Sequence, residues 1–251
     1  MARQKGIIKI QGKIGGMSFY RQNGEYLVRE AGGVSAERMR TDPAFARTRE
    51  NQAEFAEAGR QGKLIRTAFR NSLAGAPTGS SAARLTQRLM KVLQADTTNG
   101  RGERTVSDGD LALITGFEFN GKAGLDSTLF SEVSLGFDDT AEELTVSASV
   151  VPVTDVVAPA GATHFRVRSA VASLDFGEGK LKSAFAVSSE FGIKEGTAQA
   201  VSLVTAYDKS LSAHTLALVG IEFLQEVNGM MYPLRNGAFN ALQLREYHSA
   251  V

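Results

Sequence analysis

Residues 220–234 read Gly220-Ile-Glu-Phe-Leu-Gln-Glu-Val-Asn-Gly-Met-Met-Tyr-Pro-Leu234 and give the strongest indication of the fold. Two runs with strand character flank Asn228-Gly229, and both turn residues tolerate the positive φ angles of a type I′ turn. Because the twist of that turn matches the twist of paired strands, these residues predict a β-hairpin. Pro233 has no backbone N–H, which places it at the end of the return strand or on a sheet edge.

Outward from this hairpin, alternating runs rich in Val, Thr, Phe and Ser extend back to residue 111. In the run 163–174, His164, Arg166 and Arg168 alternate with Phe165 and Val167, which predicts that one face meets solvent. The regular spacing of such runs, with turn residues between them, predicts an antiparallel β-sandwich of immunoglobulin-like type over residues 111–251. The expected strands are 111–119, 128–135, 143–151, 163–174, 182–187, 198–206, 215–224 and 238–247.

Upstream of a linker at 97–110, the apolar residues recur with a helical period. Asp42-Pro43 combines an N-cap residue with proline at the first helical position, so a helix is expected from there to Leu73. Gly59 and Gly62 would permit close approach of a second element. Leu85, Leu89 and Val92 indicate a second helix, and the short Gly/Pro/Ser loop at 75–81 predicts an antiparallel helical hairpin within residues 34–96.

Basic residues recur at steps of three and four along both helices, and we call them the basic stripe: Arg60, Lys63, Arg66, Arg70, Arg84, Arg88 and Lys91. They could contact a phosphate backbone, form a solvated helix surface, or face an acidic sandwich in the same or another subunit. The nearby aromatics Phe45, Phe55 and Phe69 have core spacing and do not lie among the charges, where they could stack on bases.

Residues 1–33 predict an extended β arm interrupted by glycines. A second Asn-Gly pair, Asn23-Gly24, predicts a hairpin, but an isolated two-stranded hairpin is marginal in water. The arm therefore needs a partner surface, either on its own chain or, as we favour, on another subunit that accepts its free strand edges. The residues expected at that interface are Ile7, Ile8, Ile10, Phe19, Tyr20, Tyr26 and Val28.

The charges of the chain separate by sign. Residues 1–104 hold nineteen Lys and Arg against nine Asp and Glu, whereas residues 105–251 hold nine against eighteen, and the whole chain has a formal charge of +1. A dedicated nucleic-acid-binding protein usually keeps a positive net charge. The near balance therefore favours attraction between basic and acidic parts of different subunits.

The composition argues against the common catalytic chemistries. The absence of Cys removes disulfides and thiolate chemistry, and His164, His214 and His248 are scattered over separate predicted strands or the tail. Gly177–Lys180 lacks the spacing of a phosphate-binding loop, and no serine follows the nucleophile-elbow pattern. We therefore expect neither an enzyme nor a cofactor, and no small-molecule substrate is evident.

The sequence shows no secretory h-region and no apolar run that could span a membrane. We therefore expect that the protein is made in the cytoplasm without a signal peptide and has no membrane partner. If it acts outside the cell, we expect it to be part of a released particle or an extracellular filament.

Four segments resemble an uncharacterised family of hypothetical proteins from Bacteroidota. They are Met1-Ala-Arg-Gln-Lys-Gly-Ile-Ile-Lys-Ile, Asp42-Pro-Ala-Phe-Ala-Arg-Thr-Arg-Glu-Asn51, Ala158-Pro-Ala-Gly-Ala-Thr-His-Phe165 and Glu226-Val-Asn-Gly-Met-Met-Tyr-Pro-Leu234. The resemblance spans most of the chain and implies a shared fold, and it carries no assigned activity.

The predicted class is α+β, with an N-terminal β arm (1–33), a helical hairpin (34–96), a linker (97–110) and an antiparallel sandwich (111–251). We expect a structural homo-oligomer that self-assembles into a filament, tube or particle of phage-like type by strand exchange and charge complementarity. One alternative is a nucleic-acid-binding protein that uses the basic helices. Another is a sandwich that binds a glycan or protein through Tyr207, Tyr232 and Tyr247.

Overall fold

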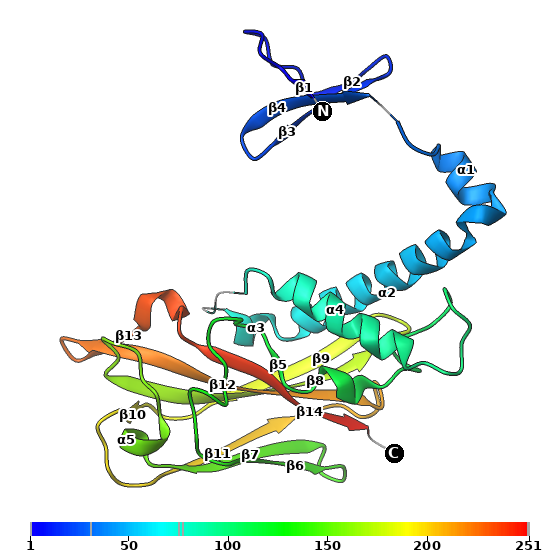
Figure 1. Ribbon diagram of the computed structural model, residues 1–251. Coiled ribbons are helices and arrows are strands. Elements are labelled where there is room, and N and C mark those ends of the chain that lie inside the picture. The colour runs from blue at the N-terminus through cyan, green and yellow to red at the C-terminus, as the bar shows by residue number, and fades with distance from the viewer. Residues whose placement is uncertain (1, 31, 75, 77, 250–251) are drawn as a thin grey trace. The chain divides into compact units, whose positions relative to one another are not determined.

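The computed structural model describes residues 2–30, 32–74, 76 and 78–249. They form two compact units, Met1–Arg49 and Glu50–Val251 (Figure 1). All strand pairs that the structure describes are antiparallel, and helices accompany them in both units. The chain is therefore a mixed α+β protein, as predicted.

The smaller unit contains a four-stranded sheet in the order β1-β4-β3-β2. Its strands are β1 (Ala2–Arg3), β2 (Gly12–Ile14), β3 (Met17–Gln22) and β4 (Glu25–Glu30). Asn23 and Gly24 have φ angles of 50° and 82°, and Gln22 pairs with Glu25, so the predicted tight hairpin is confirmed. The arm is more than one ribbon, because the chain before the hairpin adds two further short strands.

Two capped helical segments complete the smaller unit. Ser35 caps α1 (Ala36–Thr41) by accepting a hydrogen bond from Arg38 N, and Asp42 caps the 3₁₀ helix η1 (Pro43–Phe45) by accepting one from Ala44 N. The predicted start at Asp42-Pro43 is thus confirmed, as a 3₁₀ turn that leads directly into α2 (Ala46–Ala68).

In the larger unit, α2 from Glu50 onward is followed by α3 (Arg70–Leu73) and α4 (Ser81–Gln94). The close approach expected at Gly59 and Gly62 occurs at Gly62, where an added Cβ would lie 3.4 Å from Leu89 Cδ1 of α4. It does not occur at Gly59, where nothing lies within 4 Å of the Cβ position. Phe69 is buried as its spacing predicts, but Phe55 is 62% exposed, so its assignment to the core was wrong. Gly75 and Pro77 of the connecting loop lie outside the described residues.

A seven-stranded sheet forms the centre of the larger unit, with β10-β8-β12-β14-β5 as its main order, β9 paired to β8 and β13 paired to β12. A separate sheet has the order β11-β7-β6. The strands are β5 (Phe117–Glu118), β6 (Val133–Asp138), β7 (Glu143–Val150), β8 (His164–Asp175), β9 (Lys180–Val187), β10 (Phe191–Gly192), β11 (Gln199–Ala206), β12 (His214–Val227), β13 (Met230–Pro233) and β14 (Ala241–Ser249). Short helical turns lie at η2 (Leu111–Ile114), α5 (Pro152–Asp155) and η3 (Leu234–Gly237).

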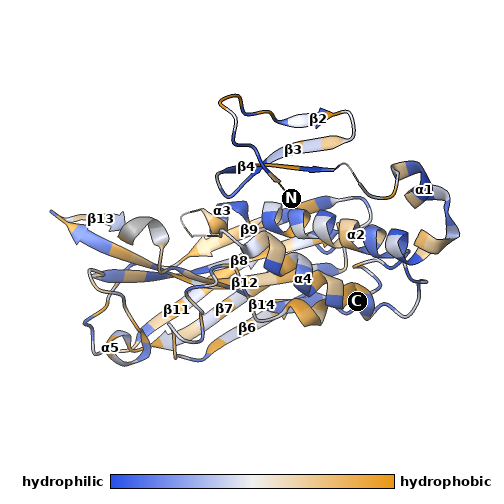
Figure 2. Ribbon diagram, turned by 45° about the horizontal axis from the view of Figure 1, so that its top comes forward, coloured by the Kyte–Doolittle hydropathy of each residue, from blue (hydrophilic) through white to orange (hydrophobic). Residues whose placement is uncertain are grey.

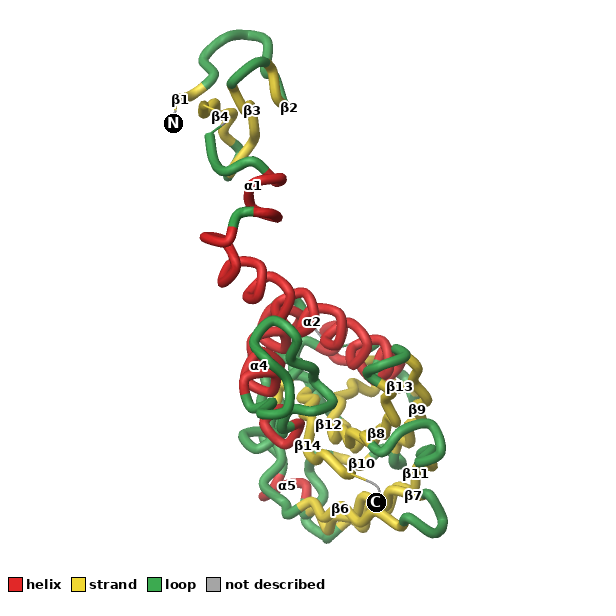
Figure 3. The backbone as a smooth tube through the Cα atoms, turned by 90° about the vertical axis from the view of Figure 1, so that its right-hand side faces the viewer, coloured by secondary structure: helices red, strands yellow, loops and turns green. Residues whose placement is uncertain are grey.

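The larger unit has three layers, with α2 and α4 on one face of the seven-stranded sheet and β6, β7 and β11 on the other (Figures 1 and 3). Leu216 and Leu218 of β12 belong to the core shared with the helices, whereas Val219 and Ile221 belong to the core between the sheets. Strand β12 is therefore covered on both faces, and Thr215–Leu224 are all buried. Figure 2 shows hydrophilic and hydrophobic segments alternating along α4, as expected for a helix with one covered face.

Two strand predictions differ from the structure, and the first differs because helices cover one face of the seven-stranded sheet. The polar face expected in 163–174 lies on the helix side of β8, so Arg166 and Arg168 are half-buried instead of solvent-facing. The first four residues of the expected strand 111–119 form the 3₁₀ turn η2, because the Asp110 side chain accepts a hydrogen bond from Ala112 N and caps it, and only Phe117–Glu118 form a strand. The two facing sheets fit a β-sandwich in its general form.

Candidate functional site

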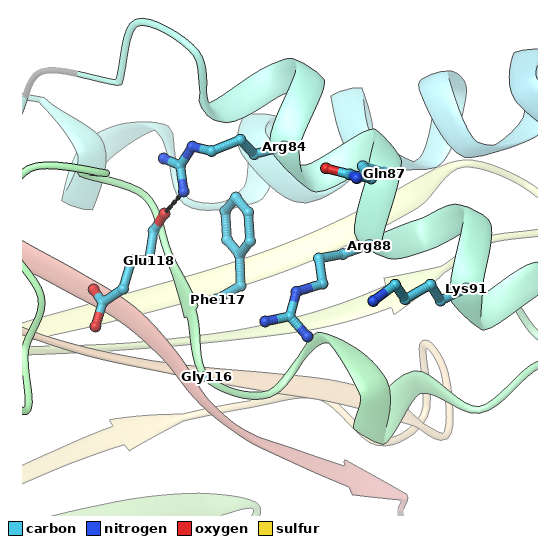
Figure 4. Close-up of a pocket in the computed structure, with 7 residues that line it drawn as sticks. All are labelled: Arg84, Gln87, Arg88, Lys91, Gly116, Phe117 and Glu118. Atoms are coloured by element: carbon cyan, nitrogen blue, oxygen red, sulfur yellow. Dashed lines mark hydrogen bonds between the residues drawn. The ribbon is translucent and has the colours of Figure 1, made fainter.

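The structure divides the basic stripe into separate groups. Arg60 and Lys63 line a pocket of about 380 Å³ beside the β8–β9 turn. Arg84, Arg88 and Lys91 line a pocket of about 410 Å³ beside β5 (Figure 4). Because β9 and β5 lie at opposite edges of the seven-stranded sheet, these two groups do not form one continuous basic track.

Most of the stripe has no neutralising carboxylate. Arg60 forms an ion pair with Glu57, one turn earlier on α2. Among the residues that the structure describes, no carboxylate lies within 4 Å of the other cationic groups on the stripe, namely those of Lys63, Arg66, Arg70, Arg84, Arg88 and Lys91. The helical layer therefore carries cations that have no close carboxylate partner among the described residues.

Arg84 differs from the rest of the stripe because its guanidinium is bound to the backbone. Nη1 donates to the Glu118 carbonyl at 2.6 Å and Nη2 to the Phe119 carbonyl at 2.8 Å. The group also lies 5.1 Å from the centroid of the Phe117 ring, within cation–π range. Arg84 thus ties α4 to β5, and its position is fixed before any ligand arrives.

Arg88 lies about one turn and Lys91 about two turns farther along α4, and both are exposed and extend toward the same pocket (Figure 4). Arg88 Nη1 donates a long 3.5 Å hydrogen bond to the Leu113 carbonyl. The backbone of Gly116 and Phe117 lines the opposite side. The pocket therefore combines one fixed cation with two that are free to reorient.

Glu118 lines this pocket, but its carboxylate is used elsewhere. Oε1 accepts hydrogen bonds from Leu125 N at 2.8 Å and Gln243 Nε2 at 2.9 Å, and in Figure 4 the carboxylate points away from Arg88 and Lys91. Burial raises the pKa of Glu118. The charge of Arg84 acts on this carboxylate and partly offsets the effect of burial on its pKa, whereas Arg88 and Lys91 have no contact with it.

The arm residues predicted at a subunit interface fall into two sets. Ile7 and Ile8 lie in the connection between β1 and β2 with essentially exposed side chains, at 104% and 80%, and Ile10 is also exposed. The other residues lie in the β3–β4 hairpin and are half-buried: Phe19, Tyr20, Tyr26 and Val28. Phe19 pairs with Val28 across the two strands. None of the described residues within 2–49 is buried, so this unit contains no core of its own.

The three tyrosines considered for glycan or protein binding have different environments. Tyr207 is buried and donates to Asp139 Oδ1 at 2.5 Å, and burial together with this bond raises its pKa. The Tyr247 hydroxyl lies 2.9 Å from His214 Nδ1. Tyr232 is 52% exposed, on β13. The structure does not gather them into one surface.

Sequence reasoning missed Gln87, Gly116 and Phe117, which line the pocket with the basic residues of α4. Gln87 lies between Arg84 and Arg88 on the same helix, so helical spacing could have indicated it. Gly116 and Phe117 come from a segment about thirty residues away, and no local sequence pattern connects them with α4.

Within the described ranges, no group of three or more His, Asp or Glu side chains is arranged to hold a metal ion. No described helix combines the length and apolar character needed to cross a membrane. No family model, curated protein or solved structure matches the chain.

Proposed function

We propose that this chain is a non-enzymatic structural protein whose copies assemble through the smaller unit into a filament, tube or particle of phage-like type. The observation that carries the proposal is the lack of any buried residue among those described in 2–49, although the unit forms a four-stranded sheet. A sheet without a core gains little from its own packing and needs a surface that covers it.

The exposed apolar side chains of the arm supply a driving force for such a contact. Burying an isoleucine side chain contributes about 1.5–3 kcal/mol, so Ile7 and Ile8 alone offer a substantial gain at an interface. Strand β1 pairs only with β4, and β2 only with β3, within the described residues. Both edges of the sheet thus offer backbone groups to a strand of another copy, which supports strand exchange.

The charges favour a second copy as the partner. Residues 1–49 contain ten Lys and Arg against four Asp and Glu, whereas residues 50–251 contain eighteen against twenty-three. The basic smaller unit of one copy is therefore attracted to the acidic larger unit of another. A contact between two different surfaces repeats from copy to copy, and it gives a ring when it closes and a filament when it does not.

The proposal is tested on the full-length protein by light scattering after size exclusion and by negative-stain microscopy. Wild type should form large species that shrink as salt increases, and Ile7→Asp/Ile8→Asp should shift the population to monomer. Val153→Asp/Val157→Asp is a matched control on the larger unit, where both valines are more than half exposed. A wild-type protein that stays monomeric at high concentration at low salt would overturn the proposal.

A second candidate, nucleic-acid binding, is favoured by the uncompensated cations of the helical layer. Gel shifts at several salt concentrations test it, because each released counterion makes affinity fall with salt. Affinity that does not change with salt would rule out this use of the helices.

A further inference from the structure

We infer that the pocket formed by Arg84, Arg88 and Lys91 is a binding site for a small ligand that carries two or more linked phosphate groups. This inference does not depend on assembly. It rests on three cations around one recess, on the absence of a described carboxylate within 4 Å of any of them, and on the fixed position of Arg84.

The three cations of the proposed site lie together at one edge of the sheet. Arg84, Arg88 and Lys91 follow one another at steps of four and three residues, so they share one side of α4. All three line the same cavity of about 410 Å³, a size that accommodates a small ligand. Cations that line one recess can all interact with the same bound anion. The ligand that best complements three such cations is therefore an oxyanion with several negative charges.

Arg84 is prepared for binding by the protein itself. Its two carbonyl contacts and the Phe117 ring hold the guanidinium in place, so little side-chain freedom is lost when an anion approaches. Of the five N–H donors of an arginine, Arg84 uses two for the carbonyls and one for a weak 3.4 Å contact with Ser80 Oγ, which leaves two for a ligand. Arg88 and Lys91 can then close on the anion from the exposed side.

The geometry favours a small phosphate compound over the backbone of a nucleic acid. Lys63 of α2 lines a different pocket, toward the opposite edge of the sheet, so a strand that follows the pocket of Arg84 does not meet Lys63 next. Phe117 is 3% exposed and covered by Arg84, so it offers no stacking surface for a base. The recognised group is therefore the phosphate chain alone.

If Arg88 and Lys91 only stabilise the helix, their substitution should have a different effect. Basic side chains in the last turns of a helix stabilise it by interacting with the negative end of the helix dipole. In that case their removal would lower the melting temperature and leave anion binding unchanged. Binding and stability must therefore be measured on the same variants.

The test is isothermal titration of full-length protein with tripolyphosphate at low ionic strength. Wild type should show saturable binding with one site per chain, and Arg88→Gln/Lys91→Gln should weaken it by about tenfold or more, since the loss of a charged contact is worth at least that factor. Lys63→Gln/Arg70→Gln is the matched control, because it removes the same charge from exposed, unpaired residues of the same layer. The control should bind like wild type.

Three results would overturn the inference: no binding by wild type, equal weakening in both double variants, or a lower melting temperature without weaker binding in Arg88→Gln/Lys91→Gln. A competition arm uses a single-stranded oligonucleotide. Inorganic diphosphate should displace tripolyphosphate, whereas the oligonucleotide at an equal phosphate concentration should not. Displacement by the oligonucleotide but not by diphosphate would contradict a small ligand.

Discussion

Glu222 accepts a hydrogen bond from Arg166 Nε at 2.7 Å, across a directly paired position of β12 and β8. The same carboxylate oxygen lies 3.0 Å from Arg168 Nε, and Glu222 is only 3% exposed. One buried carboxylate thus compensates two arginines beneath the helical layer. Removing its charge would leave the partly buried Arg168 without a carboxylate partner among the described residues and Arg166 with only the more distant Glu190, at 3.8 Å.

We therefore predict that Glu222→Gln destabilises the larger unit by about 2–4 kcal/mol, somewhat less than a fully buried pair would cost because both arginines keep some solvent contact. Urea unfolding followed by circular dichroism measures the change. Glu226→Gln is the control, since Glu226 lies on the same strand and its side chain is 44% exposed. An equal effect of both substitutions would show that the buried cluster contributes nothing specific.

Arg84→Gln should destabilise the protein by about 2 kcal/mol, because it breaks two charged hydrogen bonds to the carbonyls of Glu118 and Phe119. Arg88→Gln, one turn away, should change the free energy of unfolding by no more than about 0.5 kcal/mol, as expected for an exposed surface residue. Thermal and urea unfolding of the two variants would test this difference within the basic stripe. Similar losses for both would contradict the assigned role of Arg84.

Gly220→Ala should cost about 1–3 kcal/mol through overpacking. An added Cβ would lie 2.4 Å from Leu242 Cδ2 and 2.6 Å from the Ala241 carbonyl, so the backbone of β14 would have to move. Gly136→Ala on β6 is the matched strand control, because nothing lies within 4 Å of its Cβ position. That control should be neutral or slightly stabilising, and a loss of stability equal to that of Gly220→Ala would refute the packing explanation.

Asp208 makes stability depend on pH in the acid range. Hydrogen bonds from Ser210 and Lys182 lower the pKa of Asp208 to about 2, below the ordinary aspartate value of 3.8. A lowered pKa in the folded state stabilises it fully above the ordinary value, and the contribution is lost as pH falls toward about 2. Asp208→Asn should therefore show a smaller drop in unfolding free energy than wild type between about pH 5 and about pH 2.5, measured by urea unfolding. Identical pH profiles would disprove the contribution.

The sequence predicted local features well where the chemistry is local. The Asn23-Gly24 turn and the cap at Asp42 depend on residues close together in the chain, and both occur as expected. The strand-rich half and the helical segments also follow from periodicity. These predictions need no knowledge of what lies against each element.

The differences arise where contacts join distant residues. Arg166 and Arg168 alternate with apolar residues, as on a strand face exposed to solvent, but α2, α3 and α4 cover that face. Their charges are compensated by Glu222, which lies more than fifty residues away in the sequence. The basic stripe likewise looks continuous in sequence, yet the fold places Lys63 and Lys91 toward opposite sheet edges. The candidate site could be predicted only as a set of cations, because its other wall comes from β5.

The double cover of β12 also affects the order in which the protein can fold. Helices α2 and α4 bury their apolar sides against Leu216, Leu218 and Leu242, which follow them by more than 120 residues. Contacts so distant in sequence form late and make folding slow. During synthesis, the helices leave the ribosome well before the strands that cover them. We therefore expect the apolar side of these helices to stay exposed and prone to aggregation in nascent chains until β14 is complete. Chaperones would be most needed during this period.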